Sequence, residues 1–523
     1  MFKYQIDFAK YKLRDYEKEL ALKEFDNQFP LVKNKSVTER GIEFTTNKLL
    51  NELKLKKLTF YSEFHYQNAQ SGKSNILTNQ AIVESYCNYE PNLFQDLKPN
   101  KSRETRYLTH SLHEYKGRFY PQLAKSFMNY AGIKKGNTVL DPFCGSGTTL
   151  VESFLFGANA VGIDINPIAF LLAKAKVKSL LLKSKDFFAI KKAFDNLKEE
   201  SGWKRVSIDG YNQTFNTEYL KNWFPENNLK KIIAIQEIIC SLNNEICQLF
   251  TKVILSNLLR DYSYQDPSQL RIRRRQDAPP ENLIETFKKN LTDKIENLEK
   301  FQSLNRFELA SNVQNYLGDI RILMKSANLK PNSIDIVITS PPYATALPYV
   351  DTDRLSLFAF GFTDKTNFRK LEESLIGNRE ITKSKREQLD KELERNFESS
   401  VLPKRIIQLL KKIYLLNKDA NVGFRRKNTA ALLYKYFLDM HQGINQVSQV
   451  LKKNKFAFFV VGNNRTTAGA EDINIPTDDF VGYIAEKNNF KFVKKISMTV
   501  QKSYLIHSKN SINTESIMVL QRK

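Results

Sequence analysis

Residues 138–167 read TVLDPFCGSGTTLVESFLFGANAVGIDINP, and their pattern indicates the class of the fold. The stretch predicts a strand over Thr138–Leu140, a glycine turn, a helix that starts near Thr148, and a second strand over Ala160–Ile163. A strand, a helix and a strand in this order form a βαβ unit, the building block of α/β proteins with a parallel sheet. We therefore expect an α/β fold.

The turn between the first strand and the helix contains Gly145 and Gly147, which let the backbone approach a ligand because they carry no side chain. Two nucleotide-binding motifs fit this turn poorly. A dinucleotide fingerprint needs a third glycine or alanine where this chain has Leu150, and a P-loop needs a lysine, which does not follow Gly147. Asp141 at the strand end would also repel a pyrophosphate.

The acidic residues Asp141 and Asp164 suit a cofactor that carries a positive sulfonium and an amino-acid head group. We expect Asp141 to face the cationic end, directly or through water. Asp164 follows the second strand, where it can accept hydrogen bonds from both hydroxyls of a ribose. S-adenosylmethionine is the cofactor that fits best. The alternative is a glycine turn capped by Asp141 that binds nothing.

A second motif, ITSPPY, occupies residues 338–343 and follows an apolar strand pattern that includes Val337. Pro341 and Pro342 cannot donate to a sheet, so the strand ends abruptly. Ligands of open α/β sheets bind at the carboxyl ends of strands, and the motif places rigid polar and aromatic groups there. Taken alone, the same residues could form an ordinary proline turn.

Together, DPFCGSGTT, VGIDINP and TSPPY resemble the amino-group DNA methyltransferases, which act on cytosine N4 or adenine N6. The serine of TSPPY resembles the N4-cytosine branch, whose members occur in restriction-modification systems. The resemblance covers residues 105–180 and 312–520. It implies a Rossmann-like, S-adenosylmethionine-dependent methyltransferase sheet with helices on both faces.

The resemblance also implies the residues that bind the cofactor. Carried over position by position, these are Asp141, Pro142, Phe143, Gly145, Ser146, Gly147, Thr148 and Asp164. Asp319, in LGDI, corresponds to the partner of the adenine amino group. Phe119 and Pro121, in HEYKGRFYPQLA, are matched to the motif that closes over the methionine end of the cofactor.

The resemblance makes Ser340, Pro341, Pro342 and Tyr343 the catalytic motif. An exocyclic amine is a poor nucleophile, and two acceptors aimed at its N–H bonds would direct its lone pair toward the methyl group. We expect the Ser340 hydroxyl and the Pro341 carbonyl to be these acceptors, with Pro342 stiffening the loop. Tyr343 would stack on a base flipped out of the duplex. C5-cytosine methylation is disfavoured because no cysteine follows a proline.

The net charge of +24 and the pI near 9.5 favour a polyanionic partner, and double-stranded DNA is the partner we expect. A lysine-rich solvated surface is the alternative. Two basic stretches, QLRIRRRQDAPP and GFRRKNTA, supply the candidate DNA-binding residues Arg271, Arg273, Arg274, Arg275, Arg425 and Arg426. Tyr349 and Asp353, just after the catalytic loop, could line a base pocket or cap a helix.

The spacing of the four cysteines and five histidines indicates neither a disulfide framework nor a metal site. Charges run through the amino terminus, and no apolar stretch is long enough to span a bilayer. We expect a cytoplasmic protein that needs no metal and no membrane. The sequence leaves the oligomeric state open.

Four regions are expected along the chain. They are a mostly helical N-terminal region (1–104), the cofactor-binding half of a methyltransferase domain (105–184), a helical insertion that is a candidate target-recognition region (185–310), and the catalytic half (311–523). The insertion is expected because the chain between Asp164 and Asp319 is far longer than a usual α/β crossover. The Lys/Glu-rich stretch 380–397 is expected to be a loop.

The leading hypothesis is a site-specific DNA methyltransferase that makes N4-methylcytosine and protects host DNA beside a separate restriction endonuclease. The first alternative keeps the chemistry but changes the substrate to adenine N6 or to an RNA amino group. A second alternative is a nucleic-acid-binding protein with an inactive methyltransferase fold. A dehydrogenase is disfavoured by Leu150.

Overall fold

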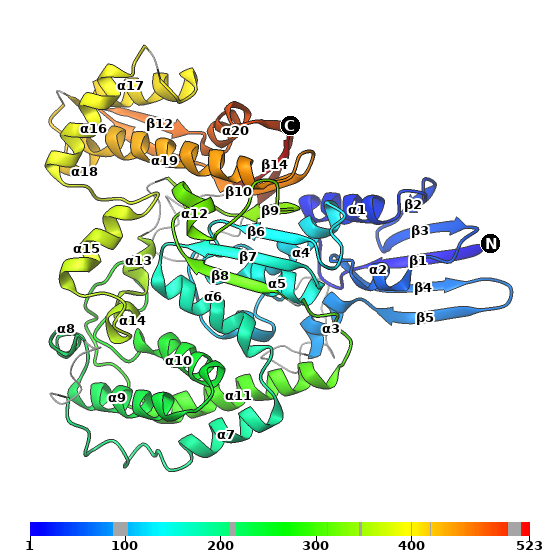
Figure 1. Cartoon of the computed structure of the whole chain (residues 1–523), viewed down its shortest axis with the longest axis horizontal. Coiled ribbons are helices and arrows are strands. Elements are labelled where there is room, and N and C mark those ends of the chain that lie inside the picture. Colours follow the sequence, from blue (N-terminus) through cyan, green and yellow to red (C-terminus); the bar gives the residue numbers. More distant parts are fainter. Residues whose placement is uncertain are drawn as a thin grey trace.

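The structure is a computed structural model that describes residues 1–86, 103–208, 216–310, 312–344, 348–398, 400–418, 420–499 and 514–523. Its centre is a seven-stranded sheet, and helices cover both faces of that sheet (Figure 1). A smaller five-stranded sheet lies at the N-terminal end of the molecule.

The central sheet has the strand order β13-β14-β10-β9-β6-β7-β8. Its strands are β6 (Thr138–Asp141), β7 (Asn159–Asp164), β8 (Val313–Leu317), β9 (Ile336–Thr339), β10 (Phe456–Gly462), β13 (Phe490–Thr499) and β14 (Thr514–Arg522). The strands from β8 to β10 are parallel, and β14 runs antiparallel to both of its neighbours. The predicted βαβ unit is present, with helix α5 (Thr148–Phe156) beginning at the expected residue.

The order of the strands reverses at β6. After β6 the chain forms β7 and β8 on one side, and it then returns to form β9 on the other side. In open α/β sheets the crevice outside the carboxyl ends of the strands at such a reversal binds the ligand. The carboxyl ends of β6 and β9 carry the two motifs of the sequence, because the glycine turn follows β6 and TSPPY follows β9.

Strand residues alternate between two apolar cores, which explains the continuous apolar runs of β9 and β10. On one face, Val139, Ile338 and Phe458 belong to the core that includes helices α4 (Pro121–Tyr130), α5 and α6 (Pro167–Ser179). On the other, Val337 and Phe459 pack with α12 (Leu323–Ser326), α19 (Thr429–Val450) and α20 (Thr477–Lys487). Short 3-10 turns η1 (Leu108–Ser111) and η2 (Ile320–Ile322) complete this part.

The N-terminal region is built mainly on a sheet, so the prediction of a mostly helical region is wrong. An antiparallel sheet of order β2-β3-β1-β4-β5 is present. Its elements are β1 (Phe2–Phe8), β2 (Lys35–Val37), β3 (Gly41–Thr46), β4 (Tyr61–Gln67) and β5 (Gly72–Leu77), with α1 (Asp15–Gln28), α2 (Glu52–Lys56) and α3 (Asn79–Tyr86). The period of two in FKYQIDF and YSEFHYQ buries Tyr4, Ile6 and Phe64, whereas the helical period belongs only to α1.

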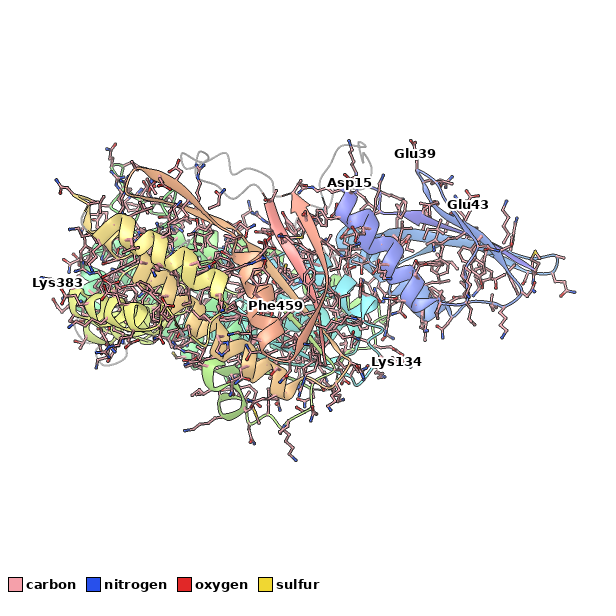
Figure 2. The ribbon with its side chains drawn as sticks, turned by 90° about the horizontal axis from the view of Figure 1, so that it is seen from above. Asp15, Glu39, Glu43, Lys134, Lys383 and Phe459 are labelled. Atoms are coloured by element: carbon pink, nitrogen blue, oxygen red, sulfur yellow. The ribbon has the colours of Figure 1, made fainter. Side chains whose placement is uncertain are left out.

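This N-terminal sheet projects from one end of the molecule. Figure 2 shows Glu39 and Glu43 at that end and Lys383 at the opposite end, with Phe459 of the central sheet between them. Buried polar contacts attach the region to helix α4. The Asn129 side chain donates to Glu24 Oε2 at 2.9 Å, and the Gln28 side chain donates to the Asn129 carbonyl at 3.0 Å.

Helices α7 (Ser184–Phe194), α8 (Thr217–Lys221), α9 (Glu226–Ser241), α10 (Glu245–Leu259) and α11 (Leu283–Ser303) form the helical insertion (residues 185–310). Within its described residues no strand longer than a single bridge occurs, so the predicted helical character is confirmed. The insertion contacts the catalytic half through a hydrogen bond of 2.9 Å between the Ser256 and Ser356 hydroxyls.

The catalytic half has a second helical group between β9 and α19. It consists of α13 (Tyr349–Thr352), α14 (Arg354–Ala359), α15 (Lys365–Ser374), α16 (Lys383–Arg395), α17 (Lys404–Lys418) and α18 (Phe424–Lys427), and a hairpin of β11 (Asn464–Ala468) and β12 (Glu471–Ile475) lies nearby. Because α16 occupies most of the stretch 380–397, the prediction of a loop there is wrong. Leu389 and Leu393, four residues apart, anchor this helix in the core.

Candidate active site

A pocket opens at the carboxyl ends of β6, β7 and β9. Its lining comes from the glycine turn, the ends of β7 and β8, the catalytic loop and the start of α13. The lining residues are Tyr115, Gly117, Pro142, Phe143, Gly145, Asp164, Ile165, Asn166, Gly318, Asp319, Ile320, Arg321, Ser340, Pro341, Pro342, Tyr343, Tyr349, Ser374, Leu375 and Ile376. The pocket therefore brings the cofactor motif and the catalytic motif of the sequence together.

The glycine turn needs its glycines for conformation and for space. Gly145 has φ +47°, and a Cβ there would lie 3.1 Å from the Tyr115 ring. Gly147 has φ +84° and caps α5, and a Cβ there would lie 2.8 Å from the Ala173 Cα. Left-handed backbone favours glycine. Ser146 and Thr148 are buried beside the turn but do not line the pocket.

Asp164 has the geometry expected of a ribose-binding carboxylate. Its oxygens accept separate backbone hydrogen bonds of 2.9 Å, one from Gly145 and one from Asn166, and the side chain lines the pocket. A carboxylate oxygen has two lone pairs, so each oxygen can still accept one hydroxyl. Burial raises the pKa of the Asp164 carboxyl to about 6.

Asp141 lies behind the pocket and is not among the residues that line it. Its carboxylate accepts hydrogen bonds from the Thr149 hydroxyl at 2.6 Å, the Thr339 hydroxyl at 2.7 Å and the Phe143 amide at 3.2 Å. Only 1% of the residue is exposed, and burial raises the pKa of its carboxyl to about 6. Asp141 thus ties the end of β6 to α5 and to β9.

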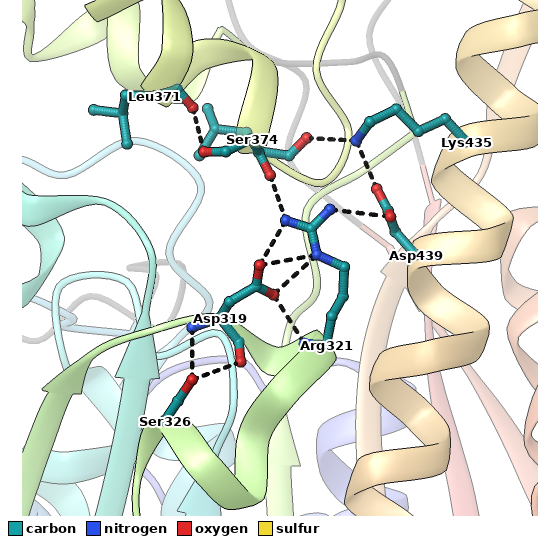
Figure 3. Close-up of polar contacts among 8 residues, drawn as sticks. Asp319, Arg321, Ser326, Leu371, Ser374, Lys435 and Asp439 are labelled. Carbon is teal, nitrogen blue, oxygen red and sulfur yellow. Dashed lines mark hydrogen bonds and ion pairs between the residues drawn. The ribbon is translucent and has the colours of Figure 1, made fainter. Parts of the chain in front are cut away.

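Asp319 lines the pocket, but Arg321 already occupies its carboxylate. Figure 3 shows the Arg321 guanidinium between Asp319 and Asp439, with its Nη2 2.6 Å from Asp319 Oδ2 and its Nη1 3.0 Å from Asp439 Oδ1. The Arg321 guanidinium also donates to the Ser374 carbonyl at 2.8 Å. Lys435 adds a bond of 2.7 Å to Asp439. The sequence analysis missed Arg321, although it lies two residues after the predicted acid.

The catalytic loop is held by partners from three other elements. The Ser340 hydroxyl donates to the Val460 carbonyl of β10 at 3.0 Å, and the Pro342 carbonyl accepts from the Tyr436 hydroxyl of α19 at 3.0 Å. The Tyr343 amide donates to the Tyr349 hydroxyl at 3.0 Å. These bonds and the two prolines hold the loop in one conformation.

The Tyr343 side chain is fixed by its hydroxyl. The hydroxyl donates to Glu515 Oε1 of β14 at 2.5 Å, and burial raises the pKa of both side chains. Gly377, with φ +79°, packs on the loop, because a Cβ there would lie 3.0 Å from the Tyr343 carbonyl oxygen. The ring of Tyr343 is therefore positioned along the pocket wall as a rigid platform.

Comparisons with known proteins agree with this geometry. The family model described as RMKL-like, methyltransferase domain, matches residues 111–200. Type II methyltransferase M.MvaI of Kocuria varians is 26% identical over 421 residues, covering 75% of this chain and 85% of the relative. Type II methyltransferase M.BsoBI of Geobacillus stearothermophilus is 26% identical, covering 75% of this chain and 81% of the relative. The relatives that align with most of this chain include type II methyltransferases that are 24% to 26% identical to it.

A shorter similarity covers 52 residues. Over them the chain is 46% identical to a tRNA (guanine(10)-N2)-dimethyltransferase of Methanothermobacter thermautotrophicus, which covers 10% of this chain and 16% of the relative. The methyltransferase matches confirm the prediction that the chain is a methyltransferase, and they confirm S-adenosylmethionine as its cofactor. The pocket fits that cofactor, since Gly145 lines it without a side chain and Asp164 retains acceptor capacity.

The segment before α4 contributes different residues to the methyltransferase pocket than we predicted. Phe119 packs against the core, and Pro121 begins α4, where proline is favoured because its missing N–H would be unpaired anyway. Tyr115 and Gly117 line the pocket instead. Gly117 has φ +84°, a backbone conformation that favours glycine. The presence of a glycine in this segment was therefore the sequence signal that could have identified Gly117 as a pocket residue.

The predicted DNA-binding arginines are divided between paired and exposed side chains. Arg271 lies 2.7 Å from Glu380, Arg275 lies 2.6 Å from Asp277, and Arg274 stacks over Trp223. Arg273, Arg425 and Arg426 are exposed. Tyr349 lines the pocket, but Asp353 does not, and lies 3.8 Å from His113 instead.

A cluster of Asp7, Glu63 and His65 on the N-terminal sheet is the grouping of possible metal ligands among the described residues. Arg40 already pairs with Asp7 at 3.0 Å, so a cation there would compete with a fixed guanidinium. In the described ranges, no helix combines the length and apolar character needed to cross a bilayer.

Proposed function

We propose that this methyltransferase acts on duplex DNA at specific sites and methylates the exocyclic N4 of a flipped-out cytosine. The observation that carries the proposal is the position of the rigid TSPPY loop, which shares one pocket with Asp164 and the glycine turn. The similarity to type II methyltransferases over three quarters of the chain supports DNA as the substrate. The serine of the motif supports cytosine through its resemblance to the N4 branch.

Ser340 is oriented to accept a hydrogen bond from the amine. Its own hydrogen is used in the bond to the Val460 carbonyl, so its remaining lone pairs can accept an N–H of the substrate. The Pro341 carbonyl supplies the second acceptor. Two fixed acceptors orient the amine lone pair away from the ring, and Tyr343 stacks on the base.

The cofactor-binding residues bind and orient the cofactor and do not react with it. When bound, S-adenosylmethionine supplies an electrophilic methyl group. Asp164 accepts the ribose hydroxyls, and Asp319, fixed by Arg321, defines the adenine end of the pocket. Asp141 holds the β6 and β9 ends together through Thr339, which sets the distance between the two motifs.

We assign target recognition to the helical insertion, and protection of host DNA beside a separate endonuclease to the enzyme as a whole. The insertion contacts the segment after the catalytic loop, where the Ile272 amide donates to Asp351 at 3.4 Å. A DNA duplex approaching the pocket would therefore also reach the insertion.

Methylation of an RNA amino group is a second candidate, favoured by the 52-residue similarity to a tRNA methyltransferase. The test is incubation of mixed-sequence duplex DNA, and separately of tRNA, with labelled S-adenosylmethionine, followed by nucleoside digestion and mass spectrometry. N4-methylcytosine from DNA is the expected product. N6-methyladenine would overturn the inference from Ser340, and labelled RNA alone would overturn DNA as the substrate.

A further inference from the structure

One arginine follows a segment that lines the active-site pocket, and two arginines from other elements interact electrostatically with it. Arg271 belongs to the loop between α10 and α11, Arg379 to the segment between α15 and α16, and Arg425 to α18. Arg379 and Arg425 are exposed. Arg379 was not among the basic residues that the sequence motifs singled out.

Residues 375–380, which we call the rim segment, connect this basic group to the pocket. Leu375 and Ile376 line the pocket, and Gly377 packs against the Tyr343 carbonyl. Arg379 follows two residues later, so its Cα lies within about 7 Å of the Gly377 Cα. Arg379 is therefore a neighbour of the catalytic loop.

One of the other two arginines contacts this segment directly, and the other lies near helix α16, which follows it. Arg271 Nη1 lies 2.7 Å from Glu380 Oε1, which joins the helical insertion to the end of the rim segment. Arg425 follows Phe424, whose ring centroid is 6.0 Å from the Arg386 guanidinium in the first turn of α16. The loop that carries Arg271 thus contacts the end of the rim segment, and Arg425 lies close enough to Arg379 for their charges to interact.

The charges of this group affect one another. Although the residue is exposed at the surface, the pKa of Arg379 is lowered because its guanidinium is partly desolvated and because the positive charges of Arg271 and Arg425 are nearby, while Glu380 acts in the opposite direction. Keeping like charges together costs energy in the free protein, and an anion that binds among them recovers it. Arginine suits a phosphate because its planar fork donates two parallel hydrogen bonds.

We propose that Arg271, Arg379 and Arg425 form an anion site that binds the backbone phosphate beside the flipped nucleotide. The inference rests on the proposed function, since a base that enters the pocket stays attached to its own phosphates, which must lie at the pocket mouth. The site binds without reading sequence, because phosphate contacts fix the position of the duplex and carry no base information.

The test compares Arg379→Gln and Arg425→Gln with two matched controls. Arg379→Lys keeps the charge, and Lys134→Gln removes one exposed charge in the loop before β6, at the opposite edge of the sheet from the pocket. Figure 2 shows Lys134 on the side of the N-terminal sheet, far from Lys383 of α16. Duplex binding is measured by fluorescence anisotropy across a salt series, and S-adenosylmethionine binding by calorimetry.

When log affinity is plotted against log salt concentration, each Gln variant is expected to reduce the steepness of the slope by about 0.9. For each tenfold rise in salt, such a variant would lose roughly eightfold less affinity than the wild type. Cofactor affinity should stay unchanged, and both controls should keep the wild-type slope. If the wild-type enzyme methylates DNA and the Gln variants keep its slope, the anion site is overturned while the proposed function stands. A wild-type chain that neither binds nor methylates DNA would overturn both.

Discussion

The hydroxyl and the ring of Tyr343 have separate tasks, and Tyr343→Phe separates them. The change removes only the hydroxyl, which donates to Glu515 at 2.5 Å. A hydrogen bond to a charged group contributes about 1.5–3 kcal/mol, and its loss leaves the partly buried Glu515 carboxylate without this donor. We expect the free energy of unfolding to fall by about 2 kcal/mol. The ring stays, so the stacking platform stays.

Removing the ring has a different effect. Stacking of a base on an aromatic side chain contributes about 1–3 kcal/mol, which corresponds to roughly 5-fold to 160-fold in affinity for the flipped base. Tyr343→Ala should therefore lose most of its activity while S-adenosylmethionine binding stays near normal. Tyr343→Phe should keep most of the activity at a temperature where the variant is folded.

The assays are denaturant unfolding and steady-state methylation of duplex DNA for both variants. Glu515→Gln is the matched control, because it keeps an acceptor for the Tyr343 hydroxyl and removes the charge. A Tyr343→Phe variant that is stable yet as inactive as Tyr343→Ala would refute the reasoning, since the hydroxyl would then take part in the chemistry.

Three further predictions concern the cofactor side of the pocket. The pKa of the Asp164 carboxyl is raised to about 6, so its ionised form is lost as the pH falls through 6. The affinity for S-adenosylmethionine, measured by calorimetry, should therefore fall about tenfold for each pH unit below that value. The Asp164→Asn variant should show no such pH dependence. Gly147→Ala should lower the free energy of unfolding, measured with denaturant, by at least about 1–2 kcal/mol, because φ is +84° and Ala173 lies too close; an unchanged value would contradict the described turn. Arg321→Met should weaken cofactor binding more than Arg321→Lys does, because lysine keeps a charge beside Asp319; equal affinities would show that the ion pair does not shape the pocket.

Local signals in the sequence predicted the βαβ unit and the pocket. The start of α5 at Thr148, the left-handed Gly147 and the end of β9 before Ser340 all follow from turn and strand chemistry within a few residues. These features are set by backbone sterics, which short motifs record well. The pairing of the two motifs in one pocket follows from the βαβ order.

Long-range contacts explain what the sequence analysis missed. The role of Asp141 depends on Thr339, which is nearly two hundred residues away, and the occupancy of Asp319 depends on a guanidinium that also bridges to Asp439. No local pattern encodes such partners. The N-terminal sheet was missed for another reason, since the helical spacing of α1 was extended to the whole region and the short alternating strands around it were not recognised.

The helical insertion enters the fold between two neighbouring strands. The chain leaves after α6, and it returns at β8, whose Val313 pairs with Ala160 of β7. The entropic cost of closing a loop grows slowly with its length, by about 0.6 kcal/mol for each doubling. The stability of the sheet therefore depends little on the length of the segment that is inserted there. Under the proposed assignment of target recognition to the insertion, a change of these helices alone would change the DNA sequence that is methylated and leave the strands of the cofactor pocket as they are.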